Sequence, residues 1–266
     1  MFVVPNYHEA VSDFSKGILN WKMWGRLGWQ ENKRRYRRTI IGPFWTTLSL
    51  GIFIGVLGIV WAKLWNQDPK IFLPYLCSGM IVWGLISSII NEGCSVFVSA
   101  EGLIKQLRFP YSLLACTVVW RNLIVFFHNL VIFFFVSLYA GFNLTWSSFL
   151  IIPGLALIFI NGIWVSVLLG LFCSRYRDIQ QVIGSILTVS VFVTPIFFTP
   201  EQLGARGLFI VDFNLLFHYL NIVRAPILGK APDALNWLIS ISGTFLGWGM
   251  TVFFFSRFRR RIPYWL

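Results

Sequence analysis

The chain has 266 residues, of which 57% are hydrophobic, 18% are aromatic and only 12% are charged. An ordinary soluble domain carries about 25% charged residues, so this composition excludes a water-soluble globular fold. The formal net charge of +12 would also fit nucleic-acid binding, but the positions of the basic residues argue against that function.

Long stretches with almost no charge predict membrane spans. Each is long enough to cross about 30 Å of hydrocarbon as a helix at about 1.5 Å per residue. Barrel strands would alternate in polarity, whereas runs such as Ile52–Val60 and Leu130–Ser137 do not alternate. We therefore predict an all-α integral membrane fold with six transmembrane helices. They are Ile40–Ala62, Ile71–Val98, Leu113–Ala140, Phe149–Cys173, Val182–Thr199 and Leu235–Ser256.

The basic residues are distributed unevenly between the two sides of these spans. With both chain ends in the cytoplasm, sixteen Lys and Arg residues fall inside and five outside. The inside residues are Lys16, Lys22, Arg26, Lys33, Arg34, Arg35, Arg37, Arg38, Lys105, Arg108, Arg175, Arg177, Arg257, Arg259, Arg260 and Arg261. The outside residues are Lys63, Lys70, Arg206, Arg224 and Lys230. Because positive residues stay on the cytoplasmic side, this asymmetry predicts six spans with both termini cytoplasmic, and it explains the charge without nucleic acid.

The segments outside the spans divide the chain into a cytoplasmic N-terminal segment, 1–39, a transmembrane domain, 40–256, and a basic cytoplasmic tail, 257–266. Within the first, Trp21–Thr39 mixes aromatic residues with seven basic ones, the pattern of an amphipathic helix in the headgroup layer. A membrane anchor is the simplest role for such a helix.

A short charged loop separates the second and third predicted spans. It consists of Glu101, Gly102, Leu103, Ile104, Lys105, Gln106, Leu107, Arg108, Phe109 and Pro110. Its length suits one short amphipathic helix, which Pro110 would end. Such a helix, projecting into the cytoplasm, predicts contact with a partner protein.

The segment Pro200–Pro232 is too apolar for a solvated loop and too broken for another span. We predict one or two short re-entrant helices that pack against protein, because backbone that does not span is tolerated at membrane depth in that arrangement. No internal repeat supports an inverted-repeat secondary transporter.

Enzyme motifs are missing from the sequence. It contains no Gly-x-x-x-x-Gly-Lys-Ser/Thr, His-Glu-x-x-His or Gly-x-Ser-x-Gly, and no metal-ligand cluster. We therefore expect no catalytic residue, metal or cofactor in this chain, and an energy source in a partner or a gradient. An intramembrane enzyme of envelope assembly and a gradient-driven carrier are the alternatives.

Five groups of residues follow one another along nearly the whole chain. They are Arg35–Trp45 (RYRRTIIGPFW), Leu103–Lys105 with Phe109–Pro110, Arg175–Ile179 (RYRDI), Pro195–Ile196, and Arg224–Pro226 with Leu228–Gly229. In this order they resemble the polysaccharide-exporting permeases of the ABC-2 type, which carry O-antigen, capsule and teichoic-acid chains across the bacterial cytoplasmic (inner) membrane.

The resemblance implies a homodimer bound to two separate ATPase subunits, which hold the ATP and magnesium. It further implies that residues 100–110 dock into the ATPase and that the segment between spans five and six forms outer gate helices. The expected function is export of a lipid-linked polysaccharide, O-antigen first, with capsule, teichoic-acid or small-molecule export as alternatives.

A pore for a sugar polymer suits aromatic and hydroxyl side chains, because sugar rings present apolar C–H faces and hydroxyl groups exchange hydrogen bonds readily. The channel candidates are Phe44, Trp45, Phe53 and Trp61 on the first span, and Thr188, Ser190, Phe192, Thr194, Phe197 and Phe198 on the fifth. Contact with lipid or neighbouring helices is the competing interpretation in a chain with 27 Phe and 13 Trp.

Charged residues near the inner membrane surface form two further predictions. Glu92 and Arg121 lie about 9 and 12 Å inside consecutive spans at the helical rise, and intramembrane charge is costly. We predict that they form an ion pair that maintains the fold. In the basic run Lys33–Arg38, Arg35 and Arg38 are candidates for contact with a lipid diphosphate, although attraction to anionic lipid explains the same residues.

Overall fold

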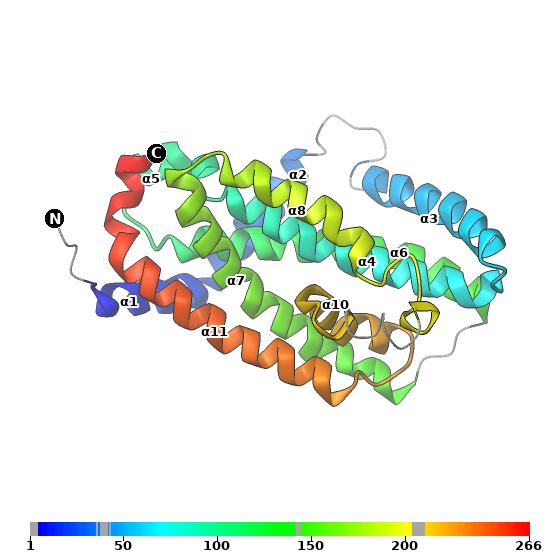
Figure 1. Ribbon diagram of the computed structural model, residues 1–266. Helices are drawn as coiled ribbons and strands as arrows, with labels where there is room; N and C mark the ends of the chain where they lie inside the picture. The colour runs from blue at the N-terminus through cyan, green and yellow to red at the C-terminus, as the bar shows by residue number, and fades with distance from the viewer. Residues whose placement is uncertain (1–4, 36, 38–41, 43, 142–144, 204–210) are drawn as a thin grey trace.

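The computed structural model describes residues 5–35, 37, 42, 44–141, 145–203 and 211–266, and the regular elements in these ranges are all helical. The predicted all-α fold class is therefore confirmed. Long helices lie side by side in a bundle (Figure 1). Segments close to both chain ends meet at one end of it, where the Asn6 amide donates to the Ser256 carbonyl at 3.1 Å. We call this the termini end.

In the part of the chain that the structure describes, five helices are long and apolar enough to cross a membrane. They are α3 (Phe44–Leu64), α4 (Pro69–Cys94), α6 (Ser112–Ala140), α7 (Ile151–Arg175) and α11 (Ala234–Phe258). The shortest, α3, has 21 residues and extends about 32 Å. These helices coincide with five of the six predicted spans, and their ends differ from the predicted ends by a few residues. Residues 40 and 41, the predicted start of the first span, lie outside the described residues.

The predicted fifth span is wrong at its C-terminal end. Helix α8 runs from Ile179 to Val193 and has 15 residues, or about 22 Å, which is shorter than the hydrocarbon core. The next residue, Thr194, has extended backbone angles of φ −79° and ψ 134°. A residue before proline is disfavoured in the helical region, so Pro195 explains why the helix stops six residues before the predicted end at Thr199.

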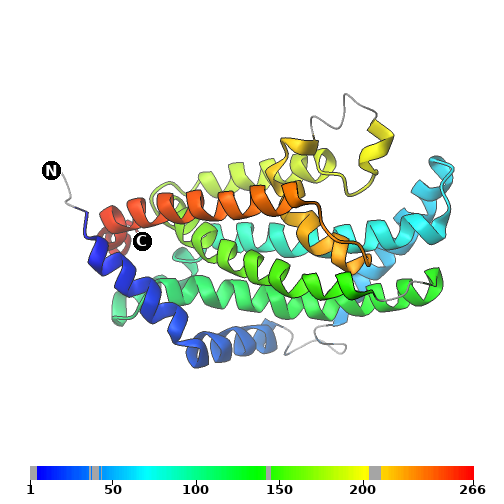
Figure 2. The same cartoon turned by 90° about the horizontal axis from the view of Figure 1, so that it is seen from below.

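The N-terminal segment forms two helices where the sequence predicted one. Helix α1 (Tyr7–Leu19) buries Ala10, Asp13, Phe14 and Gly17, one face of the helix, against α6 and α11. Helix α2 (Trp21–Arg35) packs on α6. Figure 2 shows α1 lying across the termini end and α2 turning from it to run along the bundle.

The predicted loop helix is present but ends early. After the 3₁₀ turn η1 (Val98–Ala100), α5 covers Glu101–Gln106. Leu107 is already extended, with φ −124° and ψ 145°, so Pro110 does not end this helix.

The C-terminal tail is folded. Helix α11 passes the predicted domain boundary at residue 256, and η4 (Arg259–Arg261) and α12 (Ile262–Trp265) follow it. Helix α12 packs against α5 and α7. The tail therefore supports the loop helix.

A short helix lies inside the bundle, as the sequence predicted for the segment before the last span. Helix α10 (Leu215–Ile227) packs against α4, α7 and α11, and most of its residues are buried. The 3₁₀ helices η3 (Pro200–Leu203) and η2 (Trp146–Leu150) lie in the connections before α10 and before α7. In Figure 1, α10 lies between α4 and α7.

Candidate functional site

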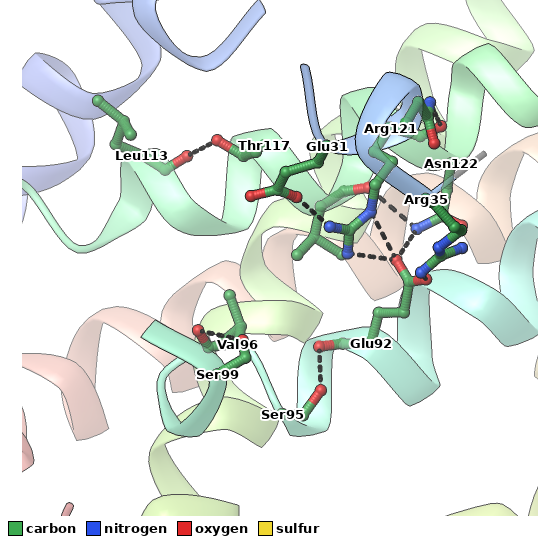
Figure 3. Close-up of polar contacts among 12 residues, drawn as sticks. Glu31, Arg35, Glu92, Ser95, Val96, Ser99, Leu113, Thr117, Arg121 and Asn122 are labelled. Carbon is green, nitrogen blue, oxygen red and sulfur yellow. Dashed lines mark hydrogen bonds and ion pairs between the residues drawn. The ribbon is translucent and has the colours of Figure 1, made fainter. Parts of the chain in front are cut away.

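The two charged residues predicted to pair meet near the termini end of the bundle. The Nη2 and Nε atoms of Arg121 on α6 lie 2.7 and 3.2 Å from Oε2 of Glu92 on α4. Figure 3 shows both side chains pointing toward one another between the helices. The structure thus brings together the residues that sequence analysis placed at similar depth.

This pair belongs to a larger charge cluster, which we define as Glu31, Arg35, Glu92, Arg121 and Asn122 (Figure 3). Arg121 also pairs with Glu31 on α2. The Arg35 Nη2 atom donates to Glu92 Oε1 at 3.0 Å, and Asn122 Nδ2 donates to Glu92 Oε2 at 2.7 Å. Two carboxylates and two guanidinium groups balance one another, so the cluster lowers the cost of withdrawing these charges from water.

Local sequence explains how α2 joins the cluster. Glu31 and Arg35 are four residues apart, which places them on one face of α2. One turn earlier, Gly28 lies against α6. A Cβ at Gly28 would lie 3.0 Å from Trp120 Cδ1 and 3.3 Å from the Thr117 carbonyl, so the absence of a side chain allows close approach. Sequence analysis missed Glu31, although its spacing from Arg35 was a visible signal.

A cavity of about 780 Å³ opens beside this cluster. Its lining residues are Trp29, Gln30, Asn32, Lys33, Arg34, Arg37, Gly42, Thr46, Ile124, Val125 and His128. We call it the basic cavity, because three of these residues carry cationic side chains that suit an anionic group. Of the two predicted phosphate contacts, Arg35 binds Glu92 and does not line the cavity. Arg38 lies outside the described residues.

The loop helix α5 presents part of its surface to the outside of the bundle. Leu103 is 39% exposed and Leu107 58% exposed, whereas Ile104 is buried. Lys105 Nζ lies 2.6 Å from Glu101 Oε1, and this hydrogen bond holds the pKa of the Glu101 carboxyl below its usual value. The remaining loop residues, Gln106, Arg108, Phe109 and Pro110, are exposed or partly exposed.

A buried carboxylate in α1 organises the chain after this loop, and sequence analysis missed it. The two carboxylate oxygens of Asp13 accept hydrogen bonds from the Tyr111 and Ser112 amides at 3.0 and 2.9 Å, which satisfies donors at the start of α6. Arg259 of the tail pairs with Asp13 at 2.7 Å and with Glu9 at 2.8 Å. Burial raises the pKa of the Tyr111 hydroxyl. The ring centroid of Tyr111 lies 4.8 Å from the guanidinium carbon of Arg259.

The predicted channel residues occupy different environments. Phe44, Trp45, Phe53, Thr188 and Phe192 are exposed, Trp61, Ser190 and Phe198 are partly exposed, and Thr194 and Phe197 are buried. Ring centroids of Trp61 and Phe197 are 6.2 Å apart, and those of Phe197 and Phe192 are 5.7 Å apart, both stacked. The structure therefore joins three of the predicted aromatics, from α3 and the end of α8, into one aromatic stack.

The predicted hydroxyl groups are engaged within the protein. Thr188 and Ser190 donate to the carbonyls of Gly184 and Ile186, each four residues earlier, at 2.9 and 2.7 Å. Thr194 Oγ1 accepts from Asn214 Nδ2 at 3.0 Å. Ser190 also borders a second cavity of about 710 Å³, whose other lining residues are Ser185, Ile186, Val189, Val193, Phe213 and Asn214.

Within the described ranges, no group of three or more His, Cys, Asp or Glu residues is arranged to hold a metal ion.

Long apolar helices around a buried short helix define a multi-pass membrane protein. A family model described as ABC-2 type transporter matches residues 24–228. This chain therefore belongs to the ABC-2 type transporter family, and the predicted resemblance is confirmed. Permeases of this family lack an ATPase domain and pair with ATPase subunits.

The chain is also similar to an individual curated protein. Over 183 residues, the chain is 26% identical to the O-antigen export system permease protein RfbA of Myxococcus xanthus. The aligned region covers 67% of this chain and 70% of that protein.

Proposed function

We propose that this chain is the transmembrane subunit of an exporter that moves a lipid-linked polysaccharide out of the bacterial cytoplasm. O-antigen is the proposed cargo. The observation that carries this proposal is the similarity to an O-antigen export permease over two thirds of the chain, within a family whose members are driven by separate ATPase subunits. Capsule or teichoic-acid polymers are the nearest alternative cargo.

The proposed topology has six crossings with both termini in the cytoplasm. Helix α8, about 22 Å long, is proposed as the fifth crossing together with the non-helical residues 194–199, and the five long helices supply the others. An even number of crossings agrees with the meeting of Asn6 and Ser256 at one end of the bundle. The termini end is then the cytoplasmic end, consistent with its excess of basic residues.

The basic cavity is the proposed binding place for the diphosphate of the lipid carrier. Lys33, Arg34 and Arg37 line it, and guanidinium groups form charge-assisted hydrogen bonds with phosphate oxygens. Arg38 follows in the same basic run and keeps its proposed role. Arg35 acts in this proposal through its contact with Glu92, which holds the C-terminal end of α2 beside the cavity.

The sugar chain is proposed to follow the exposed face of α8, enclosed by the same face of a second copy in a homodimer. Val189 and Phe192 are more than 60% exposed on this helix, and the aromatic stack of Trp61, Phe197 and Phe192 lies at its end. Aromatic faces bind sugar rings weakly and repeatedly, which suits a polymer that must keep moving.

Helix α5 is the proposed contact with the ATPase subunit. Leu103 on α5 and Leu107 directly after it are exposed, while Ile104 anchors the helix in the bundle. The following residues connect directly to α6 and its contacts with Asp13. A displacement of α5 by the ATPase subunit would therefore be transmitted to α1, α6 and the tail together.

The experiment that tests this function is co-purification of the chain with its candidate ATPase subunit, followed by measurement of ATP hydrolysis. We expect the complex to hydrolyse ATP faster when lipid-linked polysaccharide is added, and the chain alone to hydrolyse none. Hydrolysis by the purified chain alone, or an ATPase complex indifferent to every polymer tested, would contradict the proposal.

A further inference from the structure

An arginine is buried in the half of the bundle opposite the termini end. Arg224 on α10 is 3% exposed, although arginine is rarely buried without partners. Its guanidinium carbon lies 4.4 Å from the ring centroid of Tyr75 on α4, a distance typical of a cation–π contact. Its Nη1 atom donates to the Pro195 carbonyl at 2.5 Å. The side chain therefore reaches from α10 to the segment that follows α8.

Tyr75 binds the same segment. Its hydroxyl oxygen lies 2.9 Å from the Pro195 carbonyl oxygen and 3.1 Å from that of Phe198. A phenol has one proton to donate, so the two carbonyls share it. Side chains from α4 and α10 thus converge on the backbone just beyond the end of α8.

The end of α8 explains why these donors are needed. The helix stops at Val193, and carbonyl groups beyond a helix end have no donor within the helix. At membrane depth, water does not take their place, and an unsatisfied buried carbonyl is costly. Arg224 and Tyr75 satisfy the Pro195 carbonyl, so they stabilise this break in the helix.

The segment held in this way carries part of the aromatic stack. Ile196 is fully buried, and Phe197 stacks between Trp61 and Phe192. Any movement of Pro195 relative to α4 would therefore move Phe197 relative to α3.

We propose that Arg224 and Tyr75 are positioning residues that form a latch on residues 195–198 and hold the aromatic stack closed at the exit half of the transport path. The role in transport depends on the proposed function. The latch itself does not, because it is a local equilibrium between a held and a released segment.

The test uses a cysteine reporter at position 196 in the detergent-solubilised full chain. Ile196→Cys is combined with Arg224→Met or Tyr75→Phe, and maleimide labelling is followed by mass spectrometry. Tyr75→Phe keeps the ring and removes only the hydroxyl. Lys230→Met is the matched control, because Lys230 is exposed and its loss removes the same charge without touching the latch.

Loss of a charge-assisted hydrogen bond shifts such an equilibrium by about tenfold or more. We therefore expect labelling at position 196 to be about tenfold faster with Arg224→Met, clearly faster with Tyr75→Phe, and unchanged with Lys230→Met. The native cysteines Cys77, Cys94, Cys116 and Cys173 are all buried and should stay unlabelled, since a latch opens locally.

Two results would overturn the latch. One is a labelling rate at position 196 within about twofold of the parent in both variants, the range expected of a neutral substitution. The other is equal labelling of the native cysteines with Tyr75→Phe, which would mean general loosening. If Arg224→Met does not fold, Tyr75→Phe decides alone. Polymer export by the parent is measured separately, so its failure would remove the proposed function and leave the labelling result intact.

Discussion

Neutralising the central pair of the charge cluster tests how the termini end is held together. The side chains of Arg121 and Glu92 are 16% and 21% exposed, so both are largely withdrawn from water. Glu31 and Arg35 are 34% and 51% exposed and are better solvated. The substitutions Glu92→Gln and Arg121→Gln therefore remove the two charges with the strongest mutual interaction.

The expected cost follows from these exposures. Breaking a buried ion pair by removing one partner costs about 3–5 kcal/mol. Arg121 keeps Glu31 after Glu92→Gln, so we expect a smaller loss of about 2–3 kcal/mol of unfolding free energy. That loss corresponds to a fall of roughly 4–12 °C in the unfolding midpoint. Arg121→Gln leaves two acidic partners, Glu31 and Glu92, and should cost more.

A simple exchange of the two charges should not restore stability. Glutamate at position 121 would face Glu31, and arginine at position 92 would face Arg35. A double-mutant cycle with the neutral substitutions avoids these new repulsions.

The assay is thermal unfolding in lipid nanodiscs for the parent, both single variants and the double variant. We expect a coupling energy of about 1–3 kcal/mol between positions 92 and 121. Glu101→Gln is the control and should change little, because its pair with Lys105 is exposed. If the two single effects add within about 0.5 kcal/mol, the pair does not stabilise the fold as argued.

Three further predictions concern the basic cavity, the loop helix and Asp13. Replacing Arg34 and Arg37 with Gln should raise the concentration of lipid-linked diphosphate needed for half-maximal ATPase stimulation by about tenfold or more. The control Arg26→Gln, on the exposed surface of α2, should leave this concentration unchanged. Equal shifts in the two variants would contradict the cavity assignment. Leu107→Asp should reduce co-purification of the ATPase subunit without lowering the membrane level of the chain, because Leu107 is exposed; undiminished co-purification would remove this residue from the contact. Asp13→Asn should cost about 2–4 kcal/mol and speed amide hydrogen exchange at residues 107–112; unchanged exchange would show that Asp13 does not hold the start of α6.

The sequence was sufficient to locate the long helices but not the end of α8. Hydrophobic residues continue through Ile196, Phe197 and Phe198. Hydrophobicity averaged over a window of residues therefore does not reveal that the helix ends at Val193. The local signal was Thr194–Pro195, because the backbone before a proline avoids the helical region. The donors that make the break tolerable come from Tyr75 and Arg224, and only the folded structure shows that they meet there.

The candidate site was predictable where charge had no alternative to pairing. Glu92 and Arg121 lie at similar depths in consecutive apolar helices. An unpaired charge in such a helix is costly, so the sequence predicted that the two residues pair with each other. Asp13 lies in a polar segment where a carboxylate needs no explanation, and its hydrogen-bond partner Ser112 is 99 residues away. The spacing of Glu31 from Arg35 was a local signal that the two share one face of α2. Only tertiary packing shows that this face meets Arg121.

Transport in reconstituted vesicles tests the central claim most directly. The chain and its ATPase subunit are inserted into liposomes, labelled lipid-linked polysaccharide is supplied on the face that carries the ATPase, and its arrival on the other face is measured. The account predicts that polymer crosses only with ATP and only when both subunits are present. Polymer movement driven by an ion gradient without ATP, or ATP-dependent movement without this chain, would contradict it.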